Sequence, residues 1–593
     1  MPTSLAVAAL LAAAPSALAQ APDRPFGAAF TWGYELNQDE LPSYDPDRAA
    51  PPFPPARWYR IIDGILGASG RNGLWYTGPS ALPFPPLPLA PNEPVGWRTP
   101  RNLAAQYART GLSWDVAHEV WAARKALRAP GVTVLDPTVS RFAYTQRVSL
   151  VDPAYRRAAL AEIRRIAPTV RGKPYVFAWT GSDEPLIRLP RGRAAERSRY
   201  ARTMRAQVRG RYGQAAPRAT ARRTAAPAEG LRWLAYNRWA ADRFFAMKAE
   251  QAALIRRLAP GARVLPNDYG FIRGFVPWDY TRLSAFADLV EADPYVSFAE
   301  AVRPGRGRYN PGFGAKFMSD LTGVRTRVVL QAFTYSGYTP EVADLYAWAG
   351  QALRAGATDI TLFASGNPRF TDRPFYEGMQ ALARDLRGTR LPAPPTDPAT
   401  LVLYATASEG QGQPSLTGDD RYLASGDALY SLYGLLGELG HAAFSFDADA
   451  RLEREPARLA AARTVWLPRA DTLDQTFARR LADWVRAGGT LIVGDPAAFT
   501  RTPDGGSLAD VRAELIGAGL GPARPGRLVR MGPGALAAGL PADELYAAVE
   551  APSARAFDAV PEGRRWWPGS RTARRRRSAA PWAAAAWWPS RWT

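Results

Sequence analysis

The residues of this chain that could do chemistry are mainly carboxylates. The sequence has no cysteine and two histidines, which excludes thiol nucleophiles, cysteine zinc sites and nearly every histidine-dependent triad. The sharpest signal is Asp183-Glu184-Pro185, directly after the apolar run YVFAWTG that begins at Tyr175. A glutamate desolvated by an aromatic neighbour has a raised pKa and can act as a general acid near neutral pH. An acidic pair at this place is equally typical of a helix N-terminus, so the residues alone leave both interpretations open.

Further polar and aromatic residues follow other apolar runs of the sequence. They are Trp32, Tyr34, Glu35, Trp75, Tyr76, Asp136, Asn267, Asp268, Tyr269, Glu291, Asp293, Tyr295, Gln331, Phe333 and Tyr335. Rings and carboxylates together suit a sugar, which has apolar faces and a polar rim, although any single aromatic is more often a core residue. Paired carboxylates could also bind a cation such as Ca²⁺, but the sequence has no DxDxDG loop. We therefore expect a carbohydrate substrate, no metal and no cofactor.

Eight apolar runs between Phe26 and Arg390 alternate with amphipathic helical stretches, which predicts a TIM (β/α)8 barrel over 26–390. The runs are GAAFTWGYE ending at Glu35, GLWYTG from Gly73, VTVLDPTV from Val132, YVFAWTG from Tyr175, ARVLPNDYG from Ala262, ADLVEADPY from Ala287, RVVLQAF from Arg327 and DITLFAS from Asp359. Helices are expected from Pro153 and over 340–355. In such a barrel the strand ends carry the active site, so the polar residues above should meet on one face.

A Pro-rich joint at 391–398 precedes a second series of strands and helices. The runs LVLYAT, AAFSFD, TVWLP and TLIVGD predict a flavodoxin-like α/β domain over 399–550. This part has neither a GxGxxG nor a GxxxxGK[ST] motif, so a phosphate-binding loop is not expected.

The net charge of +21 is concentrated in two segments. Eleven arginines and one acidic residue lie between Arg191 and Thr224, and eight arginines with no acid lie in the tail 564–593. The first segment fits a solvated helix and loop, or a surface that attracts acidic polysaccharides. The tail fits out-of-frame translation from near Pro561, or a true Arg/Trp segment that binds nucleic acid or membrane. Because the charge is local, we expect no nucleic-acid partner.

The N-terminus has the features of an export signal. An apolar run from Leu5 to Ala14 precedes Ala17-Leu18-Ala19, which predicts a signal peptide over 1–20 and a secreted or periplasmic protein. No lysine or arginine precedes the run, and a buried N-terminal helix is the alternative. No other stretch has the length of apolar sequence that a membrane span needs, so none is expected.

The order of these motifs resembles the clan A glycoside hydrolases, most closely the family 42 β-galactosidase group. The resemblance rests on WTGSDEP after the fourth run, the long segment WLAYNRWAADRFFAMKAEQAALIRRLAP, then ADLVEADPY and RTRVVLQAF. DTLDQTFARRLADWVRAGGTLIVGD is similar to the trimerisation domain of that group, which has a glutamine-amidotransferase-like fold. Without cysteine this domain cannot use an amidotransferase thiol, and the likeness implies a homo-oligomer.

The resemblance also implies roles for individual residues. Glu184 matches the acid/base glutamate, and Trp179 and Asp183 lie beside it; Asp183 stands where the family has asparagine. Gln331 stands where the family has its nucleophilic glutamate, and an amide cannot form a glycosyl ester. Asp293 or Glu291 could serve instead, and a separation of about 6.5–9.5 Å from Glu184 would then imply inversion. Otherwise Glu341 takes the place through a shifted register, or the barrel binds sugar without cutting it.

Overall fold

The structure is a computed structural model that describes part of the chain. It describes 24–25, 28–32, 114–128, 134–135, 148–181, 185–217, 227–266, 278–296, 307–363, 373–411, 424–438 and 443–516, except 175, 186, 188, 333, 335–337, 387–388, 392 and 496, and four strands between 520 and 557. The predicted signal peptide 1–20 and the tail 564–593 lie outside the described residues. No described helix is both long enough and apolar enough to cross a membrane.

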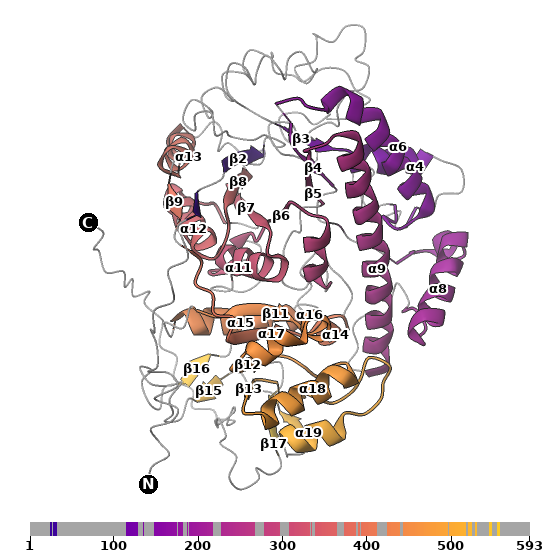
Figure 1. Cartoon of the computed structure of the whole chain (residues 1–593), viewed down its shortest axis with the longest axis vertical. Helices are drawn as coiled ribbons and strands as arrows, with labels where there is room; N and C mark the ends of the chain where they lie inside the picture. The colour runs from indigo at the N-terminus through magenta and orange to yellow at the C-terminus, as the bar shows by residue number, and fades with distance from the viewer. Residues whose placement is uncertain are drawn as a thin grey trace, which may run out of the picture. The chain divides into compact units, whose positions relative to one another are not determined.

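Seven parallel strands of the described residues form the barrel sheet (Figure 1). They are β2 (Ala28–Trp32), β3 (Trp114–Ala117), β4 (Val176–Thr180), β5 (Arg263–Leu265), β6 (Leu289–Ala292), β7 (Arg325–Gln331) and β8 (Asp359–Phe363). One group has the order β3-β4-β5 and the other β2-β8-β7-β6. The amide of Asp288 donates to the carbonyl of Val264 over 2.9 Å, beside the ends of β5 and β6. Within each group neighbouring strands follow chain order, and β8 pairs with the first strand, β2, as in a (β/α)8 barrel.

Six of the eight predicted runs contain barrel strands of the structure, and the run from Gly73 lies outside the described residues. The prediction for the run from Val132 is wrong. Val134 makes a single antiparallel bridge with Val148, and the strand beside β4 is β3, with Ala117 opposite Thr180. The run from Val132 contains Asp136-Pro137, and a proline lacks the N–H that a longer ladder would need at that position.

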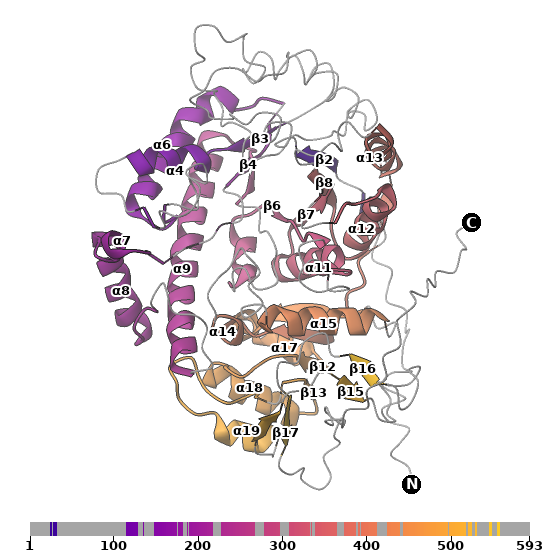
Figure 2. The same cartoon turned by 180° about the vertical axis from the view of Figure 1, so that it is seen from behind.

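Helices flank the barrel strands, with α6 and α9 on one side and α12 and α13 on the other (Figure 2). Their bounds are α4 (Glu119–Arg128), α6 (Pro153–Val170), α9 (Pro227–Leu258), α11 (Asn310–Thr322), α12 (Val342–Arg354) and α13 (Arg373–Leu386), with the 3-10 helix η3 (Tyr280–Ala285). The helix predicted from Pro153 is confirmed: Asp152 caps it by accepting from the amide of Ala154 over 2.8 Å. Its predicted apolar face is buried through Ile163 and Ile166.

The arginine-rich segment forms α7 (Arg193–Glu196) and α8 (Arg199–Tyr212). Ala201, Met204 and Val208 of α8 are buried, whereas the arginines of that helix are exposed to solvent. Two of the arginines also donate to backbone carbonyls: Arg202 to Arg197, and Arg205 to Glu196. The described part of this segment therefore has the solvated, amphipathic character that the sequence predicts.

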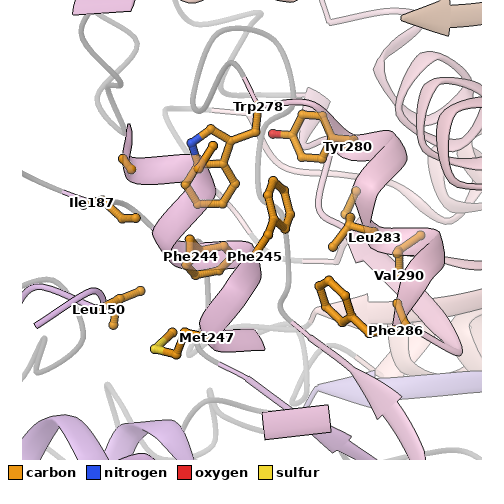
Figure 3. Packing of buried hydrophobic residues seen from close by; sticks show 14 of the residues in the cluster. Leu150, Ile187, Phe244, Phe245, Met247, Trp278, Tyr280, Leu283, Phe286 and Val290 are labelled. Carbon is orange, nitrogen blue, oxygen red and sulfur yellow. The ribbon is translucent and has the colours of Figure 1, made fainter. Parts of the chain in front are cut away.

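Aromatic side chains fill the space between α9 and η3 (Figure 3). The ring of Phe244 lies 4.4 Å from that of Trp278, centroid to centroid, and Phe245 packs edge-on against the same indole at 5.5 Å. Tyr280 and Phe286 continue this cluster, and all of these rings are buried. Burial of so much aromatic surface holds the long helix α9 against the barrel.

A second parallel sheet follows the barrel, with the order β11-β10-β12-β13. Its strands are β10 (Thr400–Tyr404), β11 (Ser445–Ala448), β12 (Thr464–Leu467) and β13 (Thr490–Val493), and its helices are α14 (Thr406–Glu409), α15 (Ala424–Glu438), α16 (Asp449–Arg454), α17 (Pro456–Ala461), α18 (Gln475–Arg486) and α19 (Ala509–Leu515). The four predicted strands are present. Both sheets are parallel, which confirms the predicted α/β class.

The second sheet packs against the barrel helices within one compact unit, Pro15–Gly517. Phe446 of β11 packs on Phe313 and Phe317 of α11, and its amide donates to Asp320 Oδ2 over 2.9 Å. Helix α9 also reaches this part, because Asn237 Nδ2 donates to the carbonyl of Gly410 over 2.8 Å. The barrel and the second sheet therefore share a buried interface.

Short strands pair at the ends of the barrel sequence and beyond residue 517. Within the compact unit, β1 (Arg24–Pro25) pairs with β9 (Arg390–Leu391) in antiparallel fashion at the start of the predicted linker. The other unit contains two antiparallel pairs: β14 (Leu520–Arg524) with β17 (Ala554–Phe557), and β15 (Leu528–Arg530) with β16 (Leu545–Ala547).

Candidate active site

Glu291, one of the two carboxylates considered on the sixth barrel strand, is engaged in an ion pair. It lies opposite Arg327 in the β6–β7 register, and its Oε2 accepts from Arg327 Nη1 over 2.9 Å. The hydroxyl of Thr361 on β8 lies 3.5 Å from the same oxygen. Both members of the ion pair are buried, and the guanidinium carbon lies 5.4 Å from the ring centroid of Phe177. Glu291 therefore neutralises a buried guanidinium.

Asp293 lies just beyond the last residue of β6. Since side chains alternate along a strand, residue 293 continues the face of Glu291 one step closer to the C-terminal end of the sheet. It is buried, and its carbonyl accepts from the amide of Tyr295 over 2.8 Å in a tight turn. The carbonyl of Tyr295 in turn accepts from Asn310 Nδ2 over 3.0 Å, which ties the turn to α11. Of the two carboxylates, Asp293 is the one nearer the C-terminal end of the sheet.

Gln331 is the last residue of β7, opposite Phe363 of β8, and it is buried. Side chains two residues apart along a strand lie on the same face, so Gln331 shares a face with Val329 and with the ion-paired Arg327. It lies at the C-terminal end of β7. Glu341 does not take this place. It precedes α12 as the N-cap residue, where its amide donates to Asp344 Oδ2 over 2.8 Å. The register is thus as the sequence predicts, with the amide of Gln331 at the end of β7.

Trp179 belongs to β4 and is almost completely buried, at 1% exposure. Its ring lies 5.9 Å from the imidazole of His118, which follows β3. The indole is thus part of the core, which is the alternative that the sequence leaves open for each aromatic. Trp32 is the last residue of β2. The remaining candidates lie outside the described residues: Tyr34, Glu35, Trp75, Tyr76, Asp136, Asp183, Glu184, Asn267, Asp268, Tyr269, Phe333 and Tyr335.

The structure adds a buried polar group that the sequence motifs do not reveal. His118 and Glu119 follow β3 directly, and α9 presents Lys248 and Gln251 to them. The Lys248 ammonium donates to Glu119 Oε1, and His118 Nε2 lies 3.2 Å from Gln251 Oε1. Burial lowers the pKa of His118 and that of Lys248. The one local signal is that Lys248 and Gln251 lie three residues apart, on one face of α9. The pairing itself gives no sequence signal, because 129 residues separate Glu119 from Lys248.

The described residues contain no group of three or more histidine, aspartate or glutamate side chains placed to hold a metal ion. Asp293 and Gln331 stand at neighbouring strand ends, and β4 ends beside the buried Lys248 group, a few residues before Glu184.

Comparison with known proteins agrees with this architecture. No family model matches the sequence, and no curated protein matches it. Among solved structures, the β-galactosidase of the Antarctic haloarchaeon Halorubrum lacusprofundi has a TM-score of 0.61 and 16% identity, over 85% of this chain and 81% of that chain. Gan42B, a GH42 β-galactosidase of G. stearothermophilus, has a TM-score of 0.59 and 13% identity, over 85% of this chain and 77% of that chain. The β-galactosidase of Bacillus circulans sp. alkalophilus has 0.57 and 15%, over 85% and 76%. At these identities the likeness shows the fold: the chain has the fold of the GH42 β-galactosidases, as the sequence motifs indicate.

Proposed function

We propose that the protein is a secreted or periplasmic glycoside hydrolase that acts on β-galactoside-like oligo- or polysaccharides. The observation that carries the proposal is the fold, which matches β-galactosidases over 85% of the chain. Asp293, a buried carboxylate just beyond β6, is the second support, and the sequence has Glu184 shortly after β4; hydrolysis of a glycosidic bond needs a proton donor and a second carboxylate. The apolar run before Ala17-Leu18-Ala19 supports export.

In this proposal Glu184 donates the proton to the leaving oxygen. Asp293 supplies the second carboxylate, since Glu291 is committed to Arg327. Gln331 cannot form a covalent glycosyl ester, but its amide can donate to a sugar hydroxyl from the end of β7. Asp293 then acts either as the nucleophile or as the base that activates water, and product stereochemistry distinguishes the two.

A panel of nitrophenyl glycosides tests this proposal, with β-galactoside, β-glucoside, β-xyloside and α-galactoside as members. Glu184→Gln and Asp293→Asn should each lower kcat/KM by about 10²-fold or more on the phenyl glycoside of the best sugar, because phenolate needs protonation to leave and each variant removes one half of the acid–base pair. Glu341→Gln is the matched control: it changes an exposed glutamate at the start of α12 and should leave the rate unchanged. A Glu184→Gln enzyme as fast as the wild type would exclude this site.

Gln331 favours a second candidate, a barrel that binds carbohydrate without cleaving it. A wild-type protein that binds galacto-oligosaccharides in calorimetry and hydrolyses no member of the panel would have this function. In that case Gln331→Glu, which supplies a carboxylate at the end of β7, should produce hydrolysis where there was none.

We also propose that the second sheet belongs to a flavodoxin-like, trimerisation-type domain over 399–550 that mediates self-association. The strand order β11-β10-β12-β13 supports this, because it is the order in which flavodoxin-like sheets begin. Light scattering on the purified chain gives the mass directly, and a mass equal to the 64.6 kDa monomer at micromolar concentration would contradict self-association.

A further inference from the structure

Helices α7 and α8 carry positive charges that few carboxylates balance. Residues 193–212 contain one acid, Glu196, and seven arginines. All seven are exposed, and together they are called the α8 arginine surface: Arg193, Arg197, Arg199, Arg202, Arg205, Arg209 and Arg211. Within the described part of the chain, only Arg211 of the seven pairs with a carboxylate, that of Asp242, over 2.7 Å. The surface therefore presents a local excess of cations to solvent.

This excess is not needed for the helix itself. Exposed arginines of α18 have carboxylate partners, namely Arg479 with Asp510 over 2.5 Å and Arg486 with Glu514 over 2.7 Å. On α8, spacings of three and four residues place Arg202, Arg205 and Arg209 on one face, where like charges repel one another. Exposed glutamines would form the same helix without that repulsion. The charges therefore indicate a role beyond the stability of α8.

Two of the guanidinium groups converge at the corner between α7 and α8. Arg205 Nη2 donates to the carbonyl of Glu196, and Arg202 Nη1 donates to the carbonyl of the next residue, Arg197. Arg205 Nε also donates to the carbonyl of Ala201 over 3.1 Å. Because two acceptors belong to consecutive residues, the two cations lie close together. A guanidinium has five N–H donors, so both side chains retain donors for the oxygens of an anion.

The opposite face of α8 is fastened to α9, which turns the arginines outward. Trp239 Nε1 donates to Gln207 Oε1 over 3.0 Å, and the Tyr212 hydroxyl donates to Asp242 Oδ2 over 2.6 Å. Both views show α8 on the outer side of α9, away from the barrel strands (Figures 1 and 2). The arginines thus belong to a formed surface, and a ligand that binds them does not have to order the helix first.

The chemistry of this surface favours an acidic polysaccharide over other polyanions. Insertion into a membrane surface needs exposed apolar side chains, but those of the described residues are Tyr346 on α12 and Leu435 on α15. Single-stranded nucleic acid stacks on aromatic rings, but the ring of Tyr200 on α8 packs 6.4 Å from that of Trp239, centroid to centroid. A uronate chain needs neither feature, because its planar carboxylates match the guanidinium fork.

We propose that the α8 arginine surface binds acidic polysaccharide through uronate carboxylates. The choice of a carbohydrate partner rests on the proposed glycosidase function, and the inference extends that function to a class of substrate that carries both uronates and cleavable glycosides. A chain held on α8 remains near the protein, which raises the effective concentration of its other linkages at the barrel.

Binding of polygalacturonate, measured by calorimetry on the full chain, tests the proposal. Its fully methyl-esterified form is the uncharged counterpart, and the wild type should bind the free acid and not the ester. Arg202→Gln combined with Arg205→Gln should weaken binding of the acid by about fivefold to tenfold, because it removes two charge-assisted contacts. Binding should also weaken as NaCl is raised, since the surface is exposed.

Two further variants make the test specific. Arg479→Gln combined with Arg486→Gln is the matched control: it removes two exposed charges of α18 that are already paired, and it should change the affinity by less than about twofold. Arg199→Gln combined with Arg209→Gln covers the case in which the first variant folds poorly. Neither of these two side chains has a partner among the described residues, so Tm should not change, and binding should still fall by about threefold or more.

The remaining outcomes separate this surface from the barrel site. Equal binding of acid and ester, no loss in either α8 variant, or an equal loss in the α18 control overturns the proposal. So does a greater loss on duplex DNA, dextran sulfate or phosphatidylserine vesicles than on polygalacturonate. The nitrophenyl panel reports on the proposed function alone, and the α8 variants should hydrolyse it at the wild-type rate. A wild type that binds polygalacturonate but hydrolyses no member overturns the glycosidase and supports the surface; the reverse result overturns the surface alone.

Discussion

Replacing Phe446 by alanine should reveal whether the barrel and the second sheet unfold together. Phe446 has no exposed surface, and its ring lies 5.7 Å from Phe313, 5.5 Å from Phe317 and 5.3 Å from Phe444, centroid to centroid. Phe313 and Phe317 belong to α11 of the barrel, whereas Phe444 directly precedes β11. The alanine variant leaves a cavity at the interface itself, and a buried Phe→Ala change destabilises by about 3–5 kcal/mol.

The size of the shift in Tm depends on how much of the chain unfolds in the same transition. The compact unit spans Pro15–Gly517, about 500 residues, and at about 2.1 cal/mol/K per residue its unfolding entropy is about 1 kcal/mol/K. A loss of about 4 kcal/mol then lowers Tm by about 4 °C. If 400–517 unfolded alone, its entropy would be about 0.25 kcal/mol/K and Tm of that transition would fall by about 16 °C.

We expect the smaller shift, in one transition, because the interface joins the two parts through buried contacts and the hydrogen bond from Phe446 to Asp320. Differential scanning calorimetry at about pH 7.5 measures it. Phe244→Ala is the control within the barrel, since Phe244 is equally buried against Trp278, and it should lower the same transition by a similar amount. Two separate endotherms, one moved by each variant, would refute the cooperative interface.

Two further predictions concern the ends of β3 and β4. Gly181→Ala should lower the free energy of unfolding in urea by about 1–3 kcal/mol, because the new β-carbon would clash with Pro266 and Lys248. The control is Gly210→Ala on α8, where the space is open, and it should raise that free energy by about 0.5–1 kcal/mol. A Gly181→Ala protein as stable as the wild type would contradict the close packing. His118 should make the protein less stable as pH falls below about 6.5, the ordinary pKa of a histidine, because burial lowers the folded-state pKa and the unfolded chain then binds the proton first. The unfolding free energy measured from about pH 7.5 to about pH 5.5 should decline in the wild type and stay flatter in His118→Gln, and an equal slope in both would exclude this role of His118.

The sequence was sufficient for the elements whose signal is local. The strands at β4, β6, β7 and β8 are short apolar runs, and α6 has an Asp-Pro start and a regular apolar face, so composition and spacing alone indicate them. β3 escaped prediction because Trp114–Ala117 is four residues long and is followed by two residues that ordinarily lie at the surface or in a site. Its status as a strand depends on pairing with β4, which no local pattern contains.

The site was predictable in part for the same reason. Asp293 and Gln331 could be placed at strand ends from the apolar runs before them. The ion pairs could not be predicted: Glu291 is held by Arg327 of the next strand, and Lys248 by Glu119 at a distance of 129 residues along the chain. A charged residue on a long helix or inside a strand gives no sequence signal of burial, because its partner comes from tertiary packing.

The pairing of β2 with β8 has a consequence for the order of events during synthesis. Ala28 lies opposite Asp359, so the two halves of this ladder are made about 330 residues apart. At a synthesis rate of about 5–20 residues per second, β8 is made roughly 20–60 seconds after β2. Neighbours such as β4 and β5, joined through α9, can meet much sooner. The first strand of the barrel to leave the ribosome thus gains its β8 partner only after more than half of the 593 residues have been made, and the temporal order of folding differs from the order of the chain.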